Sequence, residues 1–230
     1  MNLSGKKIAI TGAFGALGSA VSVAVKSAGA NVACIDFAPS AKAPATLKEF
    51  VLIGDADLGT PAAAKAALDT AATKLGGLDG VVNIAGGFRW EKIADGDLAT
   101  WDLLFNVNVR TAVNATKAAL PLFKSANTRV VNIGAAGAIK AATGMGAYAA
   151  SKAGVAKFTE ALADELKDSG TTVNAILPSI IDTPANRADM PTAEFDRWVK
   201  PQQVADLVVF LLSDRASAVT GALIPITGRV

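Results

Sequence analysis

The sequence KIAITGAFGALGSAVSVAVKSAGANVACID, residues 7–36, indicates the fold more clearly than any other part of the chain. It begins with an apolar run that predicts a strand over Lys7–Thr11, and a glycine-rich turn at 11–18 then leads into a predicted helix over 16–28. A second apolar run predicts a strand over Asn31–Asp36. Strand, helix and strand in this order are typical of a parallel sheet with right-handed crossovers.

The same alternation continues to the C-terminus. Further strands are predicted at Phe50–Ile53, Gly80–Ile84, Arg129–Ile133, Thr172–Leu177 and Leu223–Ile226, and further helices at 61–75, 97–122, 147–168 and 202–213. The short connection at 37–49 contains Pro39 and Pro44, so we expect a loop or a single turn there. Because repeats and linkers are absent, residues 1–230 are predicted to form a single-domain doubly wound (Rossmann) α/β fold, a parallel sheet of about seven strands with helices on both faces.

Composition narrows the function. The chain is 51% hydrophobic and 18% charged, which is typical of a globular protein, and a net charge of +2 without a basic block makes nucleic acid an unexpected partner. We expect neither a membrane span nor a secretory leader, and therefore a cytoplasmic protein. Histidine is absent and Cys34 is the only cysteine, so we expect no metal site, and a Ser-His-Asp triad is excluded.

The glycine turn and Asp36 together predict a dinucleotide site. Glycines allow the backbone to approach a pyrophosphate at the N-terminus of a helix. Asp36 ends the second strand, where its carboxylate can bind the hydroxyls of the adenosine ribose. The same carboxylate would repel a 2′-phosphate and no Arg or Lys lies in the turn, so NAD(H) is expected in preference to NADP(H). The alternative is that Asp36 is an ordinary residue of a strand-end turn.

Tyr148 and Lys152 form the candidate catalytic pair. They are four residues apart and therefore share one face of a predicted helix, and Tyr148 is the only tyrosine. A nearby cation is expected to lower the phenol pKa by about 1–3 units from its usual value of about 10, into a range useful for proton transfer. The alternative is an ordinary, partly exposed helix face.

These motifs, in this order, resemble the short-chain dehydrogenase/reductase family over nearly the whole chain. The resemblance implies that Tyr148 exchanges a proton while hydride moves to or from nicotinamide, that Lys152 binds the nicotinamide ribose and acidifies Tyr148, and that Asn108 positions a water. Asn108 could also be a helix-kinking side chain bonded to backbone. The implied cofactor contacts are Gly12, Phe14, Gly15, Ala16, Leu17, Gly18, Asp36, Asp57, Leu58, Asn83, Ala85, Gly86, Tyr148, Lys152, Pro178, Ile181 and Thr183. The family usually pairs its two long helices across a two-fold axis, which implies a homodimer or homotetramer.

The chain departs from the family pattern at Ala135, where a catalytic serine is usual; Gly15 also stands one place early in the glycine turn. Loss of one such hydrogen-bond donor typically costs about two to three decades of rate. Three hypotheses remain open. The chain could bind NAD(H) without catalysis, as a scaffold or sensor; another hydroxyl such as that of Thr143 could substitute; or the substrate does not need the serine.

The third hypothesis agrees with a similarity to the dihydropteridine reductase branch, which also lacks the serine. The similar segments are 15–19, 35–36, 85–88, 144–148 and 182–198. That branch acts on a quinonoid dihydropterin, a conjugated ring. The match is incomplete, because Phe88 stands where a tryptophan is expected.

The remaining site residues concern the substrate. Phe88, Arg89 and Trp90 follow the fourth predicted strand and could clamp a planar or anionic substrate, or simply pack within their own loop. Residues 184–200 are predicted to form a small lid. The candidate substrate contacts are Phe88, Trp90, Ala135, Thr143 and Trp198.

Overall fold

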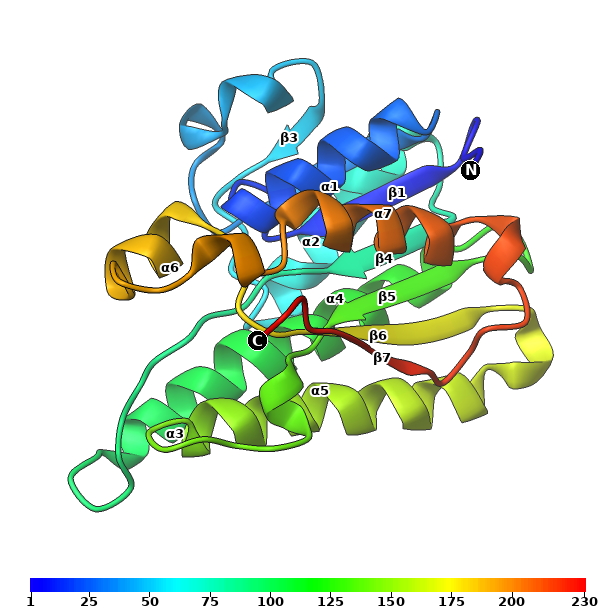
Figure 1. Cartoon of the computed structure of the whole chain (residues 1–230). Coiled ribbons are helices and arrows are strands. Elements are labelled where there is room, and N and C mark those ends of the chain that lie inside the picture. Colours follow the sequence, from blue (N-terminus) through cyan, green and yellow to red (C-terminus); the bar gives the residue numbers. More distant parts are fainter.

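Seven strands form one parallel sheet in the order β3-β2-β1-β4-β5-β6-β7. The computed structural model describes residues 1–230. The strands are β1 (Lys7–Thr11), β2 (Asn31–Ile35), β3 (Val51–Ile53), β4 (Gly80–Asn83), β5 (Arg129–Ile133), β6 (Thr172–Pro178) and β7 (Leu223–Ile226). All neighbouring pairs are parallel, so every strand ends at the same edge of the sheet, on the left in Figure 1. The predicted seven-stranded doubly wound sheet is confirmed.

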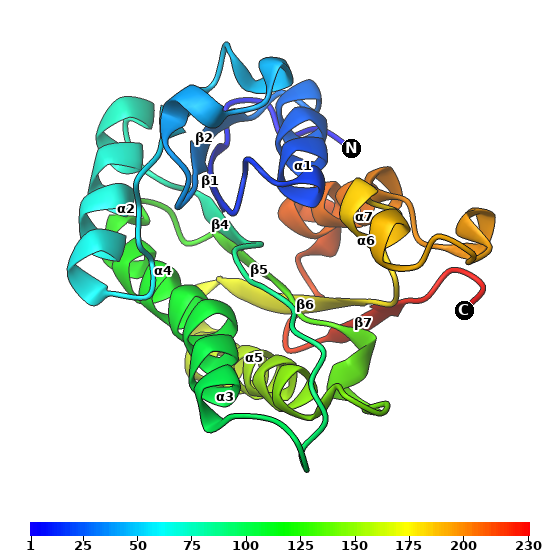
Figure 2. The same cartoon turned by 90° about the vertical axis from the view of Figure 1, so that its left-hand side faces the viewer.

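Helices cover both faces of the sheet (Figure 2). They are α1 (Ala16–Ser27), α2 (Pro61–Leu75), α3 (Leu98–Phe105), α4 (Thr111–Ala119), α5 (Gly146–Glu165), α6 (Pro184–Asp189) and α7 (Pro201–Leu212). One apolar core lies between the sheet and helices α1 and α7, and the other lies between the sheet and helices α2, α4 and α5. This two-sided burial explains why the strands are continuous apolar runs: Ile8, Ala9 and Ile10 are all fully buried.

The connection between β2 and β3 has no crossover helix. It contains two short 3₁₀ turns, Ser40–Lys42 and Ala45–Leu47, each directly preceded by a proline. A proline at the start of a turn fixes φ and has no N–H to leave unpaired, but it cannot stand in a helix interior. The prediction of a loop or single turn at 37–49 is therefore confirmed.

The predicted single helix over 97–122 is wrong in its middle. Helix α3 ends at Phe105, residues Asn106–Arg110 form a π-helical turn, and α4 begins at Thr111. The side chain of Asn108 explains the break, because it leaves the helix to bond both backbone groups of Gly87. Single π-helical turns are frequent at functional sites, and this one contacts the loop after β4.

Candidate active site

The glycine turn after β1 packs backbone against backbone. Gly12 has φ of +63°, and a Cβ built there would lie 2.7 Å from the backbone nitrogen of Ala85. A Cβ at Gly18 would overlap the carbonyl of Gly12, whereas at Gly15 the nearest atom is 3.6 Å away. Gly15 also caps helix α1 without a side-chain hydrogen bond. The turn therefore leaves an open, uncapped helix N-terminus, which fits the pyrophosphate of a dinucleotide.

Asp36 is bonded within this region. Its Oδ2 accepts a hydrogen bond from the backbone nitrogen of Phe14 at 2.9 Å, and its Oδ1 accepts one from that of Ala38 at 3.0 Å. No lysine or arginine pairs with this half-buried carboxylate. Asp36 thus holds the turn onto the end of β2, and its remaining acceptor sites can still bind ribose hydroxyls.

The next loops along the sheet edge are fixed by side chains from neighbouring elements. The Oγ1 of Thr11 accepts hydrogen bonds from the backbone nitrogens of Ile84 and Ala85, at 3.1 and 3.2 Å. Asn114 on α4 donates to the carbonyl oxygens of Leu58 and Gly59. The loop that carries Ala85 and Gly86 is therefore held beside the glycine turn, and the loop that carries Asp57 and Leu58 is held against α4.

Asn83 lies near these loops but faces the core. Its side chain is 3% exposed, and its Nδ2 donates to Thr116 on α4 and to Asn132 on β5. Its amide therefore joins β4 to β5 and α4.

A cavity of about 240 Å³ opens at the carboxyl ends of β4, β5 and β6. Among the predicted residues, its lining includes Gly86, Phe88, Ala135, Tyr148, Lys152, Pro178 and Ile181. The lining also includes Ile84, inside the segment 83–86 that was expected to line the cofactor cleft, and four residues that were not predicted, namely Gly87, Ile133, Gly134 and Ser179. All of these stand at the end of a strand or in the loop that follows it. The parallel strand order alone would have indicated them, because such strands end at one edge.

Tyr148 and Lys152 are both largely removed from water. Burial raises the pKa of Tyr148 to about 12 and lowers the pKa of Lys152 to about 8. The Nζ of Lys152 lies 6.0 Å from the centre of the Tyr148 ring and donates to the carbonyl of Ile133 at 2.9 Å. The expectation that Lys152 lowers the phenol pKa is therefore wrong for this structure, because desolvation of the phenolate outweighs a cation at this distance.

Asn108 connects the loop after β4 to helix α5. Its Oδ1 accepts from the backbone nitrogen of Gly87 at 2.9 Å, and its Nδ2 donates to the Oγ of Ser151 at 3.0 Å. Ser151 in turn donates to the carbonyl of Tyr148 at 2.7 Å. These contacts agree with the alternative that Asn108 is a helix-kinking side chain bonded to backbone. Ser151, which is 3% exposed, was not predicted; its position one residue before Lys152 was the only signal.

The predicted substrate residues are dispersed. The Phe88 ring meets the Tyr148 ring edge to face, with centroids 4.9 Å apart and planes at 83°. The indole of Trp90 covers Gly144, where a Cβ would overlap it, and Thr143 is exposed beside it. Trp198 is only 3% exposed and packs against Phe195, 4.9 Å between ring centres, so it is part of the protein interior and does not line the cavity.

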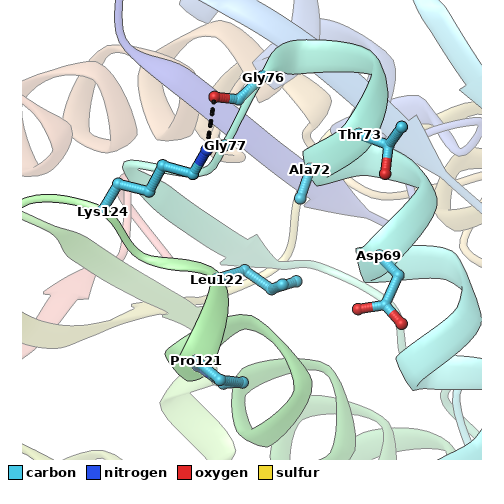
Figure 3. Close-up of a pocket in the computed structure, with 8 residues that line it drawn as sticks. All are labelled: Asp69, Ala72, Thr73, Gly76, Gly77, Pro121, Leu122 and Lys124. Carbon is cyan, nitrogen blue, oxygen red and sulfur yellow. Dashed lines mark hydrogen bonds between the residues drawn. The ribbon is translucent and has the colours of Figure 1, made fainter.

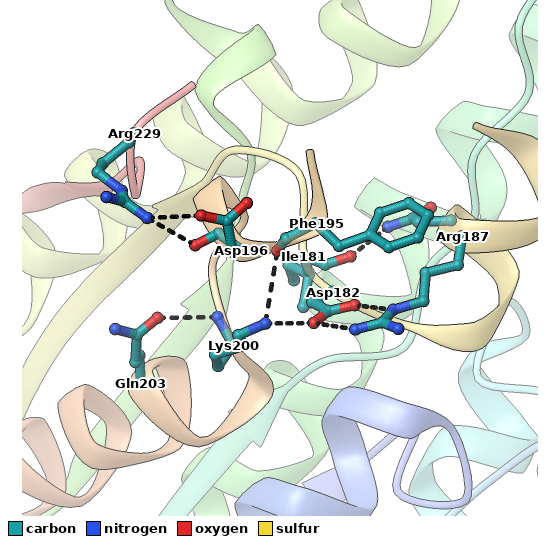
Figure 4. A network of polar contacts seen from close by, with 9 residues as sticks. Ile181, Asp182, Arg187, Phe195, Asp196, Lys200, Gln203 and Arg229 are labelled. Atoms are coloured by element: carbon teal, nitrogen blue, oxygen red, sulfur yellow. Dashed lines mark hydrogen bonds and ion pairs between the residues drawn. The ribbon is translucent and has the colours of Figure 1, made fainter. Parts of the chain in front are cut away.

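An ion-pair network fastens residues 182–200 (Figure 4). Asp182 pairs with Arg187 at 2.5 Å and with Lys200 at 2.5 Å, and these two hydrogen-bonded cations hold its pKa well below the usual range. The guanidinium of Arg187 also lies 4.6 Å from the centre of the Phe195 ring. The hydroxyl of Thr183 accepts from Asn186 and thereby caps α6. Arg187 and Lys200 are thus engaged within this segment.

A larger hollow of about 450 Å³ lies elsewhere, at the C-terminal end of α2 (Figure 3). Its lining includes Asp69, Gly76, Pro121 and Lys124, and none of the predicted site residues. The end of α2 precedes β4, so the hollow lies toward the edge of the sheet where the strands begin. The cavity at Tyr148 is therefore the candidate active site.

Known proteins are similar to this chain over nearly its whole length. The family model described as enoyl-(acyl carrier protein) reductase matches residues 12–228. The 3-oxoacyl-[acyl-carrier-protein] reductase FabG of Thermotoga maritima is 32% identical, over 99% of this chain and 98% of its own. D-beta-hydroxybutyrate dehydrogenase of Rhizobium meliloti is 28% identical, over 97% of each chain. A solved structure of a short chain dehydrogenase from Burkholderia cenocepacia in complex with NADP is 33% identical, with a TM-score of 0.91 over 99% of this chain and 98% of that one.

Proposed function

The chain belongs to the short-chain dehydrogenase/reductase family of NAD(P)-dependent oxidoreductases, and on this premise we propose that Tyr148 is its general acid/base. The enzyme would interconvert a small carbonyl, or a conjugated ring substrate, with its reduced form. The observation that carries the proposal is the cavity in which Tyr148 and Lys152 face the glycine loop after β4. A bound nicotinamide supplies or accepts the hydride.

The protein side of the reaction follows from the contacts of the two residues. In reduction, the Tyr148 phenol donates its proton to the substrate oxygen, and its raised pKa keeps it protonated at neutral pH. Lys152 uses one of its three N–H groups on Ile133, so two remain to bind the nicotinamide ribose. Asn108 holds the Gly87 backbone and, through Ser151, the first turn of α5, which sets the distance between the cofactor loop and Tyr148.

NAD(H) is the proposed cofactor, and Asp36 supports it. A carboxylate without a paired cation would repel the 2′-phosphate of NADP(H), although the Burkholderia relative was solved with NADP. Binding of both cofactors can be measured by NADH and NADPH fluorescence on wild type and Asp36→Asn. We expect wild type to bind NADH at least about tenfold more tightly than NADPH. Asp36→Asn should reduce this difference in affinity between the two cofactors. Tighter binding of NADPH by wild type would contradict the preference.

The test of the proposed reaction is NADH oxidation at 340 nm against ketones, diketones, quinones and quinonoid dihydropterin. Tyr148→Phe is the matched control, because it keeps the ring that contacts Phe88 and removes only the hydroxyl. The proposal is supported if wild type turns over a substrate and Tyr148→Phe does not. If both proteins bind the cofactor equally well and neither turns over any substrate, a non-catalytic NAD(H)-binding protein is favoured.

Dihydropteridine reduction is the second candidate, and Ala135 is the residue that favours it. Ala135 lines the cavity and is 6% exposed, so it leaves no hydroxyl to stabilise a developing alkoxide. Ala135→Ser should therefore raise kcat/KM for simple ketones, by about tenfold or more, and change it little for quinonoid dihydropterin. Absence of turnover with the dihydropterin would remove this candidate.

A homodimer or homotetramer is part of the proposal. Exposed apolar side chains on α3 support it, since Leu98 is 78% exposed and Trp101 and Leu103 are each about 40% exposed. Sedimentation of wild type and Leu98→Glu tests this face. We expect an oligomer for wild type and a smaller species for the variant; a monomeric wild type would contradict it.

A further inference from the structure

The rim of the active-site cavity consists of two loops held together by apolar contacts. The loop after β4 carries Phe88 and Trp90, and the loop after β5 carries Ala135 and Gly144. A backbone hydrogen bond of 2.9 Å from Glu91 to the carbonyl of Gly144 joins the two loops. Gly144, with φ of +74°, brings its backbone directly beneath the Trp90 indole. The loops therefore form one surface above Tyr148.

Two aromatic rings on this rim are available to a ligand. Phe88 is 56% exposed although its ring touches Tyr148, and Trp90 is 55% exposed although its indole covers Gly144. Each ring is thus fixed on one side by the protein and open on the other. Fixed, half-open aromatic rings bind flat apolar groups by stacking, at little cost in side-chain entropy.

Charged groups are scarce around the cavity. Lys152 is the only charged residue in the lining, and one of its N–H groups is already bonded to Ile133. Arg89, between the two aromatic residues, donates toward the Thr100 hydroxyl on α3 at 3.4 Å. Asp182, just before the predicted lid at 184–200, already pairs with Arg187 and Lys200 within it (Figure 4).

A carboxylate or phosphate on the substrate would therefore enter a cavity in which Lys152, already bonded to Ile133, is the only charged residue. Burial of a charge without a partner is strongly unfavourable. Arg89, Lys92 and Lys140 are exposed on the same two loops and, like Trp90, lie outside the cavity lining. The sequence had left both a planar and an anionic substrate open; the lining favours the planar one, and Arg89→Ala tests the anionic one.

We infer that the substrate is an uncharged compound with a flat, conjugated or aromatic group next to the reacting carbon, which Phe88 and Trp90 bind. The inference rests on the proposed hydride transfer and names its substrate class. Where the reacting carbon is itself part of the conjugated system, as in a quinone or a quinonoid ring, the inference also agrees with Ala135, because the charge created by hydride addition is then delocalised and the demand for a separate hydroxyl falls.

The test measures binding apart from turnover. Tyr148→Phe loaded with NADH is titrated, by tryptophan fluorescence, with benzoylformate and with its methyl ester, which differ in charge and by one methyl group. Methyl pyruvate, in which a methyl group replaces the phenyl ring, is the third ligand. We expect the aromatic ester to bind at least about tenfold more tightly than either the acid or methyl pyruvate.

Variants at the rim identify the residues responsible. In the same Tyr148→Phe background, Phe88→Ala and Trp90→Ala should each reduce the preference for the aromatic ester over methyl pyruvate. Arg89→Ala should change neither this preference nor the preference for the ester over the acid. The inference would be overturned if the acid bound as tightly as the aromatic ester or more tightly, or if the ester did not bind. It would also be overturned if both Phe88→Ala and Trp90→Ala kept the aromatic preference unchanged, or if Arg89→Ala lost binding of the acid alone. If the ester binds as expected but wild type reduces nothing, the proposed reaction fails while this inference stands.

Discussion

The two ends of the cleft are built differently. At the proposed cofactor end, polar side chains that are buried or half-buried fix the backbone: Asp36 accepts from the Phe14 nitrogen, and Thr11 accepts from the Ile84 and Ala85 nitrogens. At the proposed substrate end, Phe88 and Trp90 are half exposed. The first set of contacts holds the loops to the sheet edge. The second set can change residue by residue without changing the fold.

Ala135 lies at the boundary between these two ends. It follows β5 and is held in place by the sheet, yet its side chain faces the cavity that the substrate would occupy. Its departure from the family pattern therefore changes the chemistry offered to the substrate and leaves the cofactor end intact. Variants at the proposed substrate end should accordingly alter kcat, and variants at the proposed cofactor end should alter the affinity for NADH.

The largest effect is expected for Tyr148→Phe, at the substrate end. Removal of the hydroxyl leaves no acid for the substrate oxygen, so kcat should fall by about 10²–10⁴-fold. The ring and its contact with Phe88 remain, and the dissociation constant for NADH should stay within about twofold. Steady-state kinetics and cofactor titration on the same preparation check both values. A large loss of NADH affinity would show that the two ends are not separable.

At the cofactor end, Gly12→Ala should impair binding strongly. A Cβ at Gly12 would press on the Ala85 backbone at 2.7 Å in a left-handed conformation, which costs about 1–3 kcal/mol in strain and displacement. Gly15→Ala is the matched control, because φ is −72° and the nearest atom is 3.6 Å away. We expect a lower melting temperature and weaker NADH binding for Gly12→Ala, and no loss of melting temperature for Gly15→Ala. Equal melting temperatures would contradict the packing described here.

The pH dependence of reduction should report Lys152. Its pKa of about 8 in the free enzyme means that the ammonium is present below pH 8 and lost above it, while Tyr148 keeps its proton up to about pH 12. The value of kcat/KM for reduction should therefore be level below pH 8 and fall about tenfold per pH unit above it. Lys152→Arg keeps the charge and should remove this fall. A fall that persists in Lys152→Arg would assign it to another group.

Lys152 is also expected to affect the stability of the fold, and its contribution to stability should rise with pH, whereas the rate of reduction should fall. Burial lowers the pKa of Lys152 from 10.5 to about 8, so between these pH values the unfolded chain binds more protons than the folded one. The contribution of Lys152 to the free energy of unfolding therefore rises with pH across that window, and Lys152→Met should remove this rise. Denaturant titrations at pH 7.5 and 9.5 measure it.

The smallest effect is expected for Ser151→Ala, which breaks the bridge from Asn108 to Tyr148. One buried hydrogen bond typically contributes about 0.5–1.5 kcal/mol, so a few-fold fall in kcat is expected, with little change in KM for NADH. Ser151→Thr retains the hydroxyl and should recover part of the loss. If Ser151→Ala lowers only the melting temperature and leaves kcat unchanged, the bridge has no role in positioning Tyr148.

What the sequence predicted and what it missed differ in physical origin. The parallel sheet and the glycine turn follow from local patterns, namely apolar runs and the residues that separate them. The π-helical turn at Asn108 depends on the distant backbone of Gly87, and the raised pKa of Tyr148 depends on packing around the phenol. Trp198 could not be placed either, since its burial depends on how residues 184–200 fold back so that Val199 pairs with Ile181 after β6.

The most direct test of the central claim is to follow the hydrogen itself. Wild-type enzyme is given NADH deuterated at nicotinamide C4, on one face at a time, together with the ketone it reduces best, and the product is analysed by mass spectrometry. The account predicts one deuterium on the former carbonyl carbon, from one face only, and no product with Tyr148→Phe at matched times. Product without deuterium from either face, or equal product from the variant, would contradict it.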